Sequence, residues 1–277
     1  MSRWTAQDKE AYRTEVTQRL TAAMPSVMQE YSSINWEEEL KGYRTDHDYY
    51  PDYIHAPIHG VTDGYTNPRN CLAWDAAMDA IIPLSHKVSC QQLREKMVQL
   101  IPLDAQIETV LELGAGTAEG ALALARRFPQ ATFTVTDVSP YMLVIAKHKF
   151  NKAGFGVSGA TLKEHRVKFE QVDARHTPYP DNSFDLVTSS LLFHETPKEW
   201  TPKILKEMYR ITKPNGWVLY ADTYRGEYAF NASFQEPWLN DFIQFNFEYE
   251  FAKAGFTQLD YVRYGVGLWY MLGRKRE

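Results

Sequence analysis

The stretch VLELGAGTAEG, residues 110–120, decides the fold of this chain. An apolar run leads into glycines 114, 116 and 120, and the pattern predicts a strand, a tight turn and the start of a helix. A dinucleotide fingerprint needs its third glycine at the position of Glu119, one residue earlier than here. Glu112 adds a carboxylate that disfavours a phosphate and favours a cationic ligand. No Gly-Lys-Ser/Thr follows, which argues against a P-loop.

Short β-branched runs alternate with amphipathic stretches from residue 107 onward, which predicts βαβ units and an α/β fold with a doubly wound parallel sheet. Expected strands cover residues 108–113, 131–136, 165–172, 184–189 and 216–221, and expected helices cover 117–128, 140–153, 198–212 and 237–254. Two further strands, at 256–263 and 266–273, are close enough in the chain to pair as a hairpin.

Acidic residues end the second and third expected strands. TVTDVSPYML places Asp137 about 20 residues after the glycines, where a carboxylate can accept both hydroxyls of a ribose. FEQVDAR places Asp173 at the third strand tip, where it can accept the amino group of an adenine. Because the carboxyl ends of parallel strands share one edge of the sheet, we expect Glu112, Asp137 and Asp173 to border one ligand site.

Four stretches, in this order, resemble the motifs of class I S-adenosylmethionine-dependent methyltransferases of the small-molecule type, similar to quinone-biosynthesis methyltransferases. They are VLELGAGTAEG, TVTDVSPYML, VDARHTPYPDNSFDLVTSSLLFHE and EMYRITKPNGWVLYAD, within about residues 105–222. The resemblance implies a seven-stranded sheet of order 3-2-1-4-5-7-6 with strand 7 antiparallel. It also implies transfer of a methyl group from S-adenosylmethionine to a small molecule, with release of S-adenosylhomocysteine. Whether the acceptor atom is O, N or C stays open.

The resemblance also implies a set of cofactor contacts. Gly114 and Gly116 are expected to let the backbone approach the methionine part of the cofactor, with Glu112 near its positive end. Asp137 is expected to take the ribose hydroxyls, with Ser190 closing the other side together with its neighbour. The full expected set is Tyr65, Glu112, Gly114, Gly116, Asp137, Val138, Met142, Asp173, Ala174 and Ser189.

His194, in SSLLFHET just past the fourth expected strand, is the best candidate for a catalytic base, because histidine exchanges protons near neutral pH. The alternative is a histidine that only packs in the pocket wall, and Glu195 beside it is a weaker candidate. The expected substrate contacts are Tyr50, His59, His194, Tyr224 and Arg225.

Residues 1–104 lack these motifs, and we expect them to form a helical cap and substrate lid over a Rossmann-like core of residues 105–277. Residues 4–31 have helical periodicity, and Pro25 is expected to break that helix in two. Helices are also expected near 71–82 and 90–100. The loop at 43–69 is rich in aromatics that could line the pocket, and Tyr65 could reach the cofactor carboxylate.

The formal net charge of −5 argues against a general nucleic-acid surface. No apolar run approaches the roughly 18 residues that span a bilayer. The polar start lacks a secretory signal, so no membrane insertion and a cytoplasmic location are expected. His47, His55 and His59 do not form a convincing metal pattern, because Pro57 argues against a helical pair, and no metal is expected.

Two alternatives remain at this point. An NAD-dependent oxidoreductase shares the strand-end acid, although the late third glycine, Glu112 and Asp173 count against it. A non-catalytic scaffold that binds S-adenosylmethionine would keep the same cofactor motifs, so the motifs do not distinguish it from an enzyme. The sequence does not indicate an oligomeric state.

Overall fold

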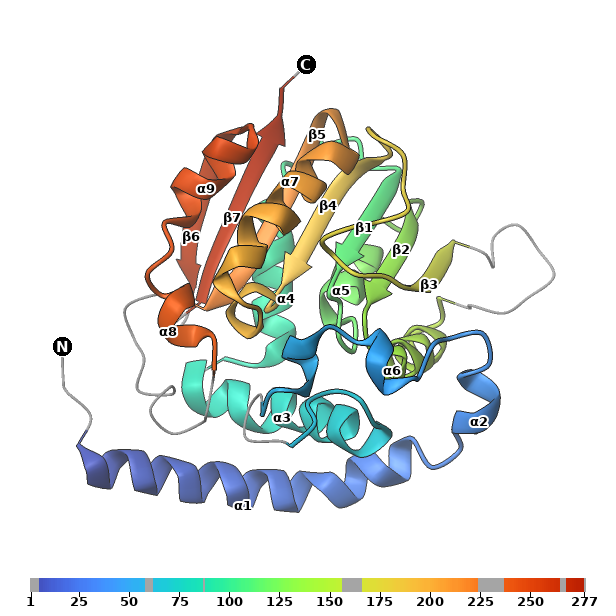
Figure 1. Ribbon diagram of the computed structural model, residues 1–277, viewed down its shortest axis with the longest axis vertical. Coiled ribbons are helices and arrows are strands. Elements are labelled where there is room, and N and C mark those ends of the chain that lie inside the picture. Colours follow the sequence, from blue (N-terminus) through green and yellow to red (C-terminus); the bar gives the residue numbers. More distant parts are fainter. Residues whose placement is uncertain are drawn as a thin grey trace.

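A computed structural model describes residues 5–57, 62–86, 88–155, 166–223, 237–264 and 268–276. In this described part, seven strands form one sheet of order β3-β2-β1-β4-β5-β7-β6 (Figure 1). The strands are β1 Thr109–Leu113, β2 Thr132–Asp137, β3 Val167–Gln171, β4 Phe184–Ser190, β5 Thr212–Thr223, β6 Phe256–Tyr264 and β7 Leu268–Lys275. The first five pair in parallel, and β7 runs antiparallel to both neighbours. The predicted fold class is confirmed.

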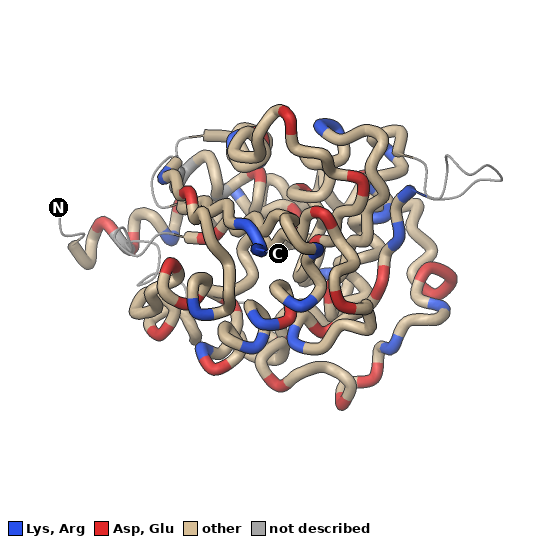
Figure 2. Tube along the Cα trace, turned by 90° about the horizontal axis from the view of Figure 1, so that it is seen from above, with Lys and Arg blue, Asp and Glu red and all other residues tan. Residues whose placement is uncertain are grey.

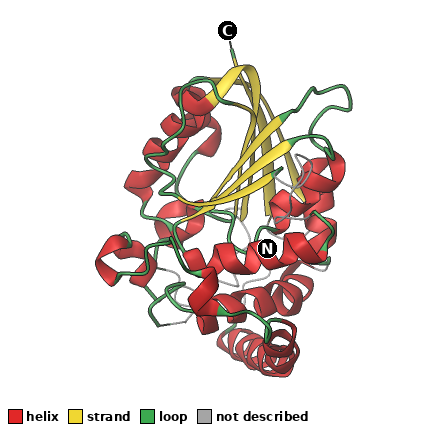
Figure 3. Cartoon of the chain, turned by 90° about the vertical axis from the view of Figure 1, so that its right-hand side faces the viewer, coloured by secondary structure: helices red, strands yellow, loops and turns green. Residues whose placement is uncertain are grey.

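Helices cover both faces of the sheet (Figure 3). Successive side chains of a strand point to opposite faces, so neighbours in β1, β4 and β5 enter different core clusters. Val110, Leu186 and Leu219 belong to a cluster with α4 Cys90–Val98, α5 Glu119–Arg127 and α6 Pro140–Lys152. Leu111, Val187 and Val218 belong to a second cluster, with α7 Thr201–Ile211 and α9 Phe247–Ala254. Burial on both faces explains why these strands are almost continuously apolar.

Two expected helices differ in detail from the structure. The helix expected at 237–254 is divided into α8 Leu239–Phe242 and α9, because the Asn246 side chain accepts from the backbone N–H of Tyr249 and starts a new helix. The helix expected at 198–212 begins with a short 3-10 turn, η5 Lys198–Trp200, which follows η4 Phe193–Glu195.

The N-terminal segment forms α1 Ala6–Glu30, α2 Trp36–Glu39, η1 His47–Tyr49, η2 Asp52–His55 and α3 Pro68–His86. The expected break at Pro25 is wrong, since α1 continues through it. Pro25 removes one helical hydrogen bond, but α1 packs along α3, and Val16 before Pro25 and Tyr31 just after α1 are both buried. Packing on both sides keeps the helix in one piece.

The N-terminal elements lie along the carboxyl-terminal edge of the parallel strands (Figure 1). A mostly buried ion cluster holds them there. Lys149 of α6 pairs with Asp75 of α3 and with Glu119 of α5. The Tyr31 hydroxyl donates to Asp75 Oδ2 at 2.8 Å. We call the described residues between 5 and 86 in this arrangement the cap; α4 lies instead against a face of the sheet. The cap covers the sheet edge at which open α/β folds bind their ligands.

Lys and Arg are interspersed with Asp and Glu along the chain trace (Figure 2). Within the described ranges, no helix has both the length and the apolar character needed to cross a bilayer. The same ranges contain no group of three or more His, Cys, Asp or Glu side chains placed to hold a metal ion.

Candidate functional site

The glycine turn after β1 has a backbone that only glycine adopts easily. Gly114 has φ +60° and Gly116 has φ +53°, in the left-handed region that a Cβ disfavours. A Cβ on Gly114 would lie 2.7 Å from Cδ1 of Leu192. The turn therefore leaves backbone exposed at the carboxyl end of β1, where a ligand can approach it closely.

The third glycine of the motif has a structural role. Glu112 is buried, and its Oε2 accepts from the backbone N–H of Ala121 at 2.8 Å, in the first turn of α5. A Cβ on Gly120 would lie 2.2 Å from Glu112 Oε1, so Gly120 makes room for that carboxylate. Burial raises the pKa of Glu112 to about 7. The late glycine thus belongs to a helix start held by Glu112, and not to a dinucleotide turn.

Asp137 ends β2 with its carboxylate directed to the glycine turn. Oδ2 accepts from the backbone N–H of Gly116 at 2.8 Å, and Oδ1 accepts from that of Ser139 at 2.8 Å. Burial raises its pKa to about 6, and the negative charge of Glu195 contributes, while the backbone hydrogen bonds act in the opposite direction. The two backbone hydrogen bonds therefore fix the orientation of this carboxylate.

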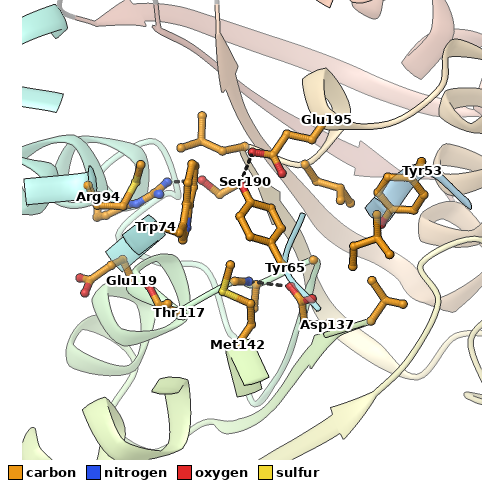
Figure 4. Close-up of a pocket in the computed structure, with 18 residues that line it drawn as sticks. Tyr53, Tyr65, Trp74, Arg94, Thr117, Glu119, Asp137, Met142, Ser190 and Glu195 are labelled. Carbon is orange, nitrogen blue, oxygen red and sulfur yellow. Dashed lines mark hydrogen bonds between the residues drawn. The ribbon is translucent and has the colours of Figure 1, made fainter. Parts of the chain in front are cut away.

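A cavity of about 650 Å³, including its open mouth, lies between the glycine turn and the cap (Figure 4). Six residues expected at the cofactor line it, namely Tyr65, Gly114, Gly116, Asp137, Val138 and Met142. Four further residues line it: Tyr53 of the aromatic loop that was expected at the pocket, Glu195, the weaker candidate for the base, and Trp74 and Arg94, to which the sequence gave no role.

Arg94 of α4 is the only arginine or lysine among the described residues that line the cavity. One guanidinium nitrogen donates to the Ser190 hydroxyl, and the buried Nε has no hydrogen-bond partner within the described residues. Ser190 lines the cavity, whereas Ser189 is fully buried elsewhere. Alternation along β4 directs these two serines to opposite faces of the sheet, so Ser190 replaces Ser189 as the lining residue.

The predicted adenine contact Asp173 is engaged with a neighbour. Its carboxylate makes a bidentate pair with Arg175, with Nη2 to Oδ2 at 2.6 Å, and the guanidinium stacks 3.4 Å from the ring centre of Trp200. Neither Asp173 nor Ala174 is among the residues lining the cavity. Their role at the adenine therefore stays a prediction. It requires the Asp173 carboxylate to bind the adenine amino group while it is paired with Arg175.

The aromatic loop contributes Tyr53 and Tyr65 to the cavity lining, but not Tyr50. Tyr50 is buried in a cluster with Tyr31, Ile54 and Met142 and is not itself among the lining residues. Tyr53 lines the cavity and packs edge-on against Trp200. Burial, together with the charges of Asp137 and Asp173, raises the pKa of Tyr53 well above its ordinary value, so the phenol stays protonated.

His194 is held one layer behind the cavity wall. It is 4% exposed and is not among the lining residues. Its Nδ1 is 2.7 Å from Asp222 Oδ1, and its Nε2 is 3.7 Å from Glu195 Oε1. The Tyr65 hydroxyl donates to the same Glu195 oxygen at 3.1 Å. His194 therefore reaches the cavity through Glu195.

Three expected substrate contacts, His59, Tyr224 and Arg225, lie outside the described residues. The sequence also missed Asp222 and Arg94 as parts of the site. Asp222 follows the apolar run VLYA in β5. An acid at the end of the fifth strand was therefore the signal that could have identified Asp222 as part of the site. No signal marked Arg94, because α4 looks like an ordinary amphipathic helix with several polar residues.

Residues 110–216 match a family model described as a methyltransferase domain. A malonyl-[acyl-carrier protein] O-methyltransferase of Marinomonas sp. is 30% identical over 135 residues, covering 48% of this chain and 44% of that protein. A demethylmenaquinone methyltransferase of Geobacillus kaustophilus is 35% identical over 114 residues, covering 41% of this chain and 44% of that protein. The chain therefore matches less than half the length of these relatives.

A solved structure of a SAM-dependent methyltransferase from Aquifex aeolicus superimposes with a TM-score of 0.55. It is 19% identical, and the superposition covers 75% of this chain and 98% of that one. At this identity the likeness concerns the fold alone. The fold and the matched domain agree, and neither of the two curated relatives above is an oxidoreductase.

Proposed function

We propose that this chain, whose residues 110–216 match a methyltransferase-domain model, is a class I S-adenosylmethionine-dependent methyltransferase that transfers a methyl group to a small-molecule acceptor. One observation carries the proposal most directly. The glycine turn and the Asp137 carboxylate face one cavity, joined by the hydrogen bond from Gly116 N–H to Asp137 Oδ2. This arrangement offers exposed backbone and a fixed ribose acceptor side by side.

The residues of the cavity fit the parts of the cofactor. Asp137 would accept the ribose hydroxyls, and Val138 and Met142 would pack against the adenine. Gly114 and Gly116 would lie against the methionine part. Arg94 offers a guanidinium for the methionine carboxylate, since its Nε has no described partner and a planar guanidinium matches a carboxylate. Arg94 takes the role that the sequence gave to Tyr65.

Bound S-adenosylmethionine supplies a methyl group on a positively charged sulfur, which leaves as a neutral thioether. The chain must hold the acceptor in line with that methyl and exclude water. Positioning of this kind contributes up to about 7–11 kcal/mol to catalysis. The cap contributes to both tasks, because Tyr53, Tyr65 and Trp74 close the cavity over the glycine turn. An acceptor with an exchangeable proton also needs a base, and we propose that His194 takes part in removing that proton.

Two measurements test this function. Calorimetry should detect binding of S-adenosylmethionine and of S-adenosylhomocysteine, and no comparable binding of NADH. Incubation of the protein and S-adenosylmethionine with a metabolite extract should produce compounds heavier by one methyl group, with matching release of S-adenosylhomocysteine. Cofactor binding without any methylated product would instead favour the non-catalytic scaffold. Absence of cofactor binding would contradict the proposal altogether.

A further inference from the structure

We infer that Glu195, and not the neighbouring His194, is the group that faces the acceptor and takes its proton. His194 and Asp222 lie behind Glu195 and receive that proton, and Tyr65 of the cap positions the Glu195 carboxylate. This inference rests on the proposed function and specifies how its acceptor side works.

The cavity lining separates the two candidates for the base. Glu195 and Tyr65 line the cavity, whereas His194 does not. Figure 4 shows the Tyr65 ring between Asp137 and Glu195, with its hydroxyl directed at the Glu195 carboxylate. A base must come within hydrogen-bond reach of the proton that it removes. By that criterion Glu195 qualifies, and His194 acts only through it.

The polar groups behind Glu195 lie in a series, in which His194 is hydrogen-bonded to Asp222 and lies just beyond hydrogen-bond distance of Glu195. His194 Nε2 is 3.7 Å from Glu195 Oε1, and His194 Nδ1 is 2.7 Å from Asp222 Oδ1. Asp222 is fully buried and also accepts from the backbone N–H groups of Phe193 and Thr223. A carboxylate fixed at Nδ1 holds the N–H of a neutral imidazole there and leaves Nε2 as the acceptor toward Glu195.

Tyr65 links this series to the cofactor side of the cavity. The Ser139 hydroxyl donates to the Tyr65 backbone carbonyl at 2.6 Å, and the Ser139 backbone N–H donates to Asp137 Oδ1 at 2.8 Å. The loop after β2 therefore sets the position of the tyrosine whose hydroxyl holds Glu195. The ribose acceptor and the base are thus aligned through one short segment of the core.

The step balances with the proposed reaction. A bond forms between the acceptor atom X and the methyl carbon as the bond from that carbon to sulfur breaks, and the sulfur leaves with the electron pair. The X–H proton passes to a Glu195 oxygen and then to His194 Nε2. The imidazolium is stabilised by the two carboxylates of Glu195 and Asp222 until it releases the proton. The route serves O–H and N–H acceptors, and a carbon acceptor only if its C–H is acidic.

Sinefungin tests the position of Glu195 without knowledge of the acceptor, because it carries an ammonium group where the cofactor carries its methyl. Calorimetry should give the affinity for sinefungin relative to S-adenosylhomocysteine in each variant. Glu195→Gln should lower this ratio by about tenfold or more, as a charged hydrogen-bond partner is lost. Tyr65→Phe should lower it by a smaller factor. Glu199→Gln, an exposed carboxylate four residues away, should leave the ratio unchanged.

The rate of S-adenosylhomocysteine release with a metabolite extract tests the proton transfer itself. Glu195→Gln should reduce the rate by about 10²–10⁴-fold, the usual contribution of general base catalysis, and Glu195→Asp should restore part of it. An unchanged sinefungin ratio, or an unchanged rate in Glu195→Gln, would overturn the role of Glu195. Either result with an active wild-type protein leaves the proposed function intact, whereas an inactive wild-type protein contradicts that function instead.

Discussion

The two walls of the cavity are built in different ways. The wall proposed for the cofactor, here the cofactor wall, consists of Gly114, Gly116 and Asp137, which come from one βαβ unit and are joined by a hydrogen bond within it. The wall proposed for the acceptor, here the acceptor wall, consists of Tyr65, Glu195 and Asp222, which come from the cap, the segment after β4 and the end of β5. The first wall follows from local chain geometry, and the second exists only once distant segments have packed. Substitutions should therefore damage the two walls differently.

The largest effect is expected where the cap joins the core. Lys149→Met removes the cation between Asp75 and Glu119 and leaves two carboxylates close together in a mostly buried place. Breaking a buried ion cluster in this way should lower the free energy of unfolding by about 3–5 kcal/mol, measured by urea denaturation. Lys152→Met is the matched control, since Lys152 pairs with Glu30 at the surface and should cost less than about 1 kcal/mol. Equal losses would show that the ion cluster does not fasten the cap.

Gly114→Ala should give the next largest effect. The new side chain would be strained at φ +60° by about 1–2 kcal/mol, and its Cβ would push Leu192, itself a lining residue, toward the cavity. We expect at least tenfold weaker binding of S-adenosylhomocysteine in calorimetry. Gly154→Ala is the control, because Gly154 has φ +81° but nothing within 4 Å of a Cβ. Gly154→Ala should reduce stability alone. A loss of affinity in Gly154→Ala would show that displacement of Leu192 is not the reason for weaker binding in Gly114→Ala.

Asp137→Ala should weaken binding of S-adenosylmethionine by about 1–3 kcal/mol, because hydrogen bonds to a charged acceptor are lost. Calorimetry on the folded variant measures the change. The ratio of sinefungin to S-adenosylhomocysteine affinity should fall less than in Glu195→Gln, because Asp137 acts on Tyr65 only through Ser139. An affinity equal to that of the wild type would exclude Asp137 from the cofactor site.

Glu112→Gln should have the smallest effect and a distinctive pH dependence. The folded-state pKa of Glu112, about 7, is above its unfolded value, so the folded protein loses stability as pH rises from about 4.5 through 7. Glutamine keeps an acceptor for the Ala121 N–H and escapes this loss. The variant should match the wild type at pH 4.5 and be more stable than the wild type at pH 8 in urea denaturation. A destabilised variant at pH 8 would show that the charge itself holds α5.

Prediction from sequence succeeded where a short pattern fixes the geometry. The strand order, the antiparallel β7 and the placement of Gly114, Gly116 and Asp137 beside one cavity agree with the structure. It failed where packing competes with a local rule, as at Pro25, which α1 passes through. Of Ser189 and Ser190, which the sequence expected together on this side of the site, only Ser190 lines the cavity, because successive residues of a strand point to opposite faces.

The sequence by itself determined the α/β core and the cofactor wall of this protein, because hydrophobic periodicity, glycines at left-handed positions and strand-end acids act over a few residues. The tertiary structure decided the rest of the site. It placed Arg94 beside Ser190, put Glu195 in front of His194 and brought Tyr65 to Glu195. Such contacts join segments up to 130 residues apart, and only the packing of the whole chain sets the distances between them.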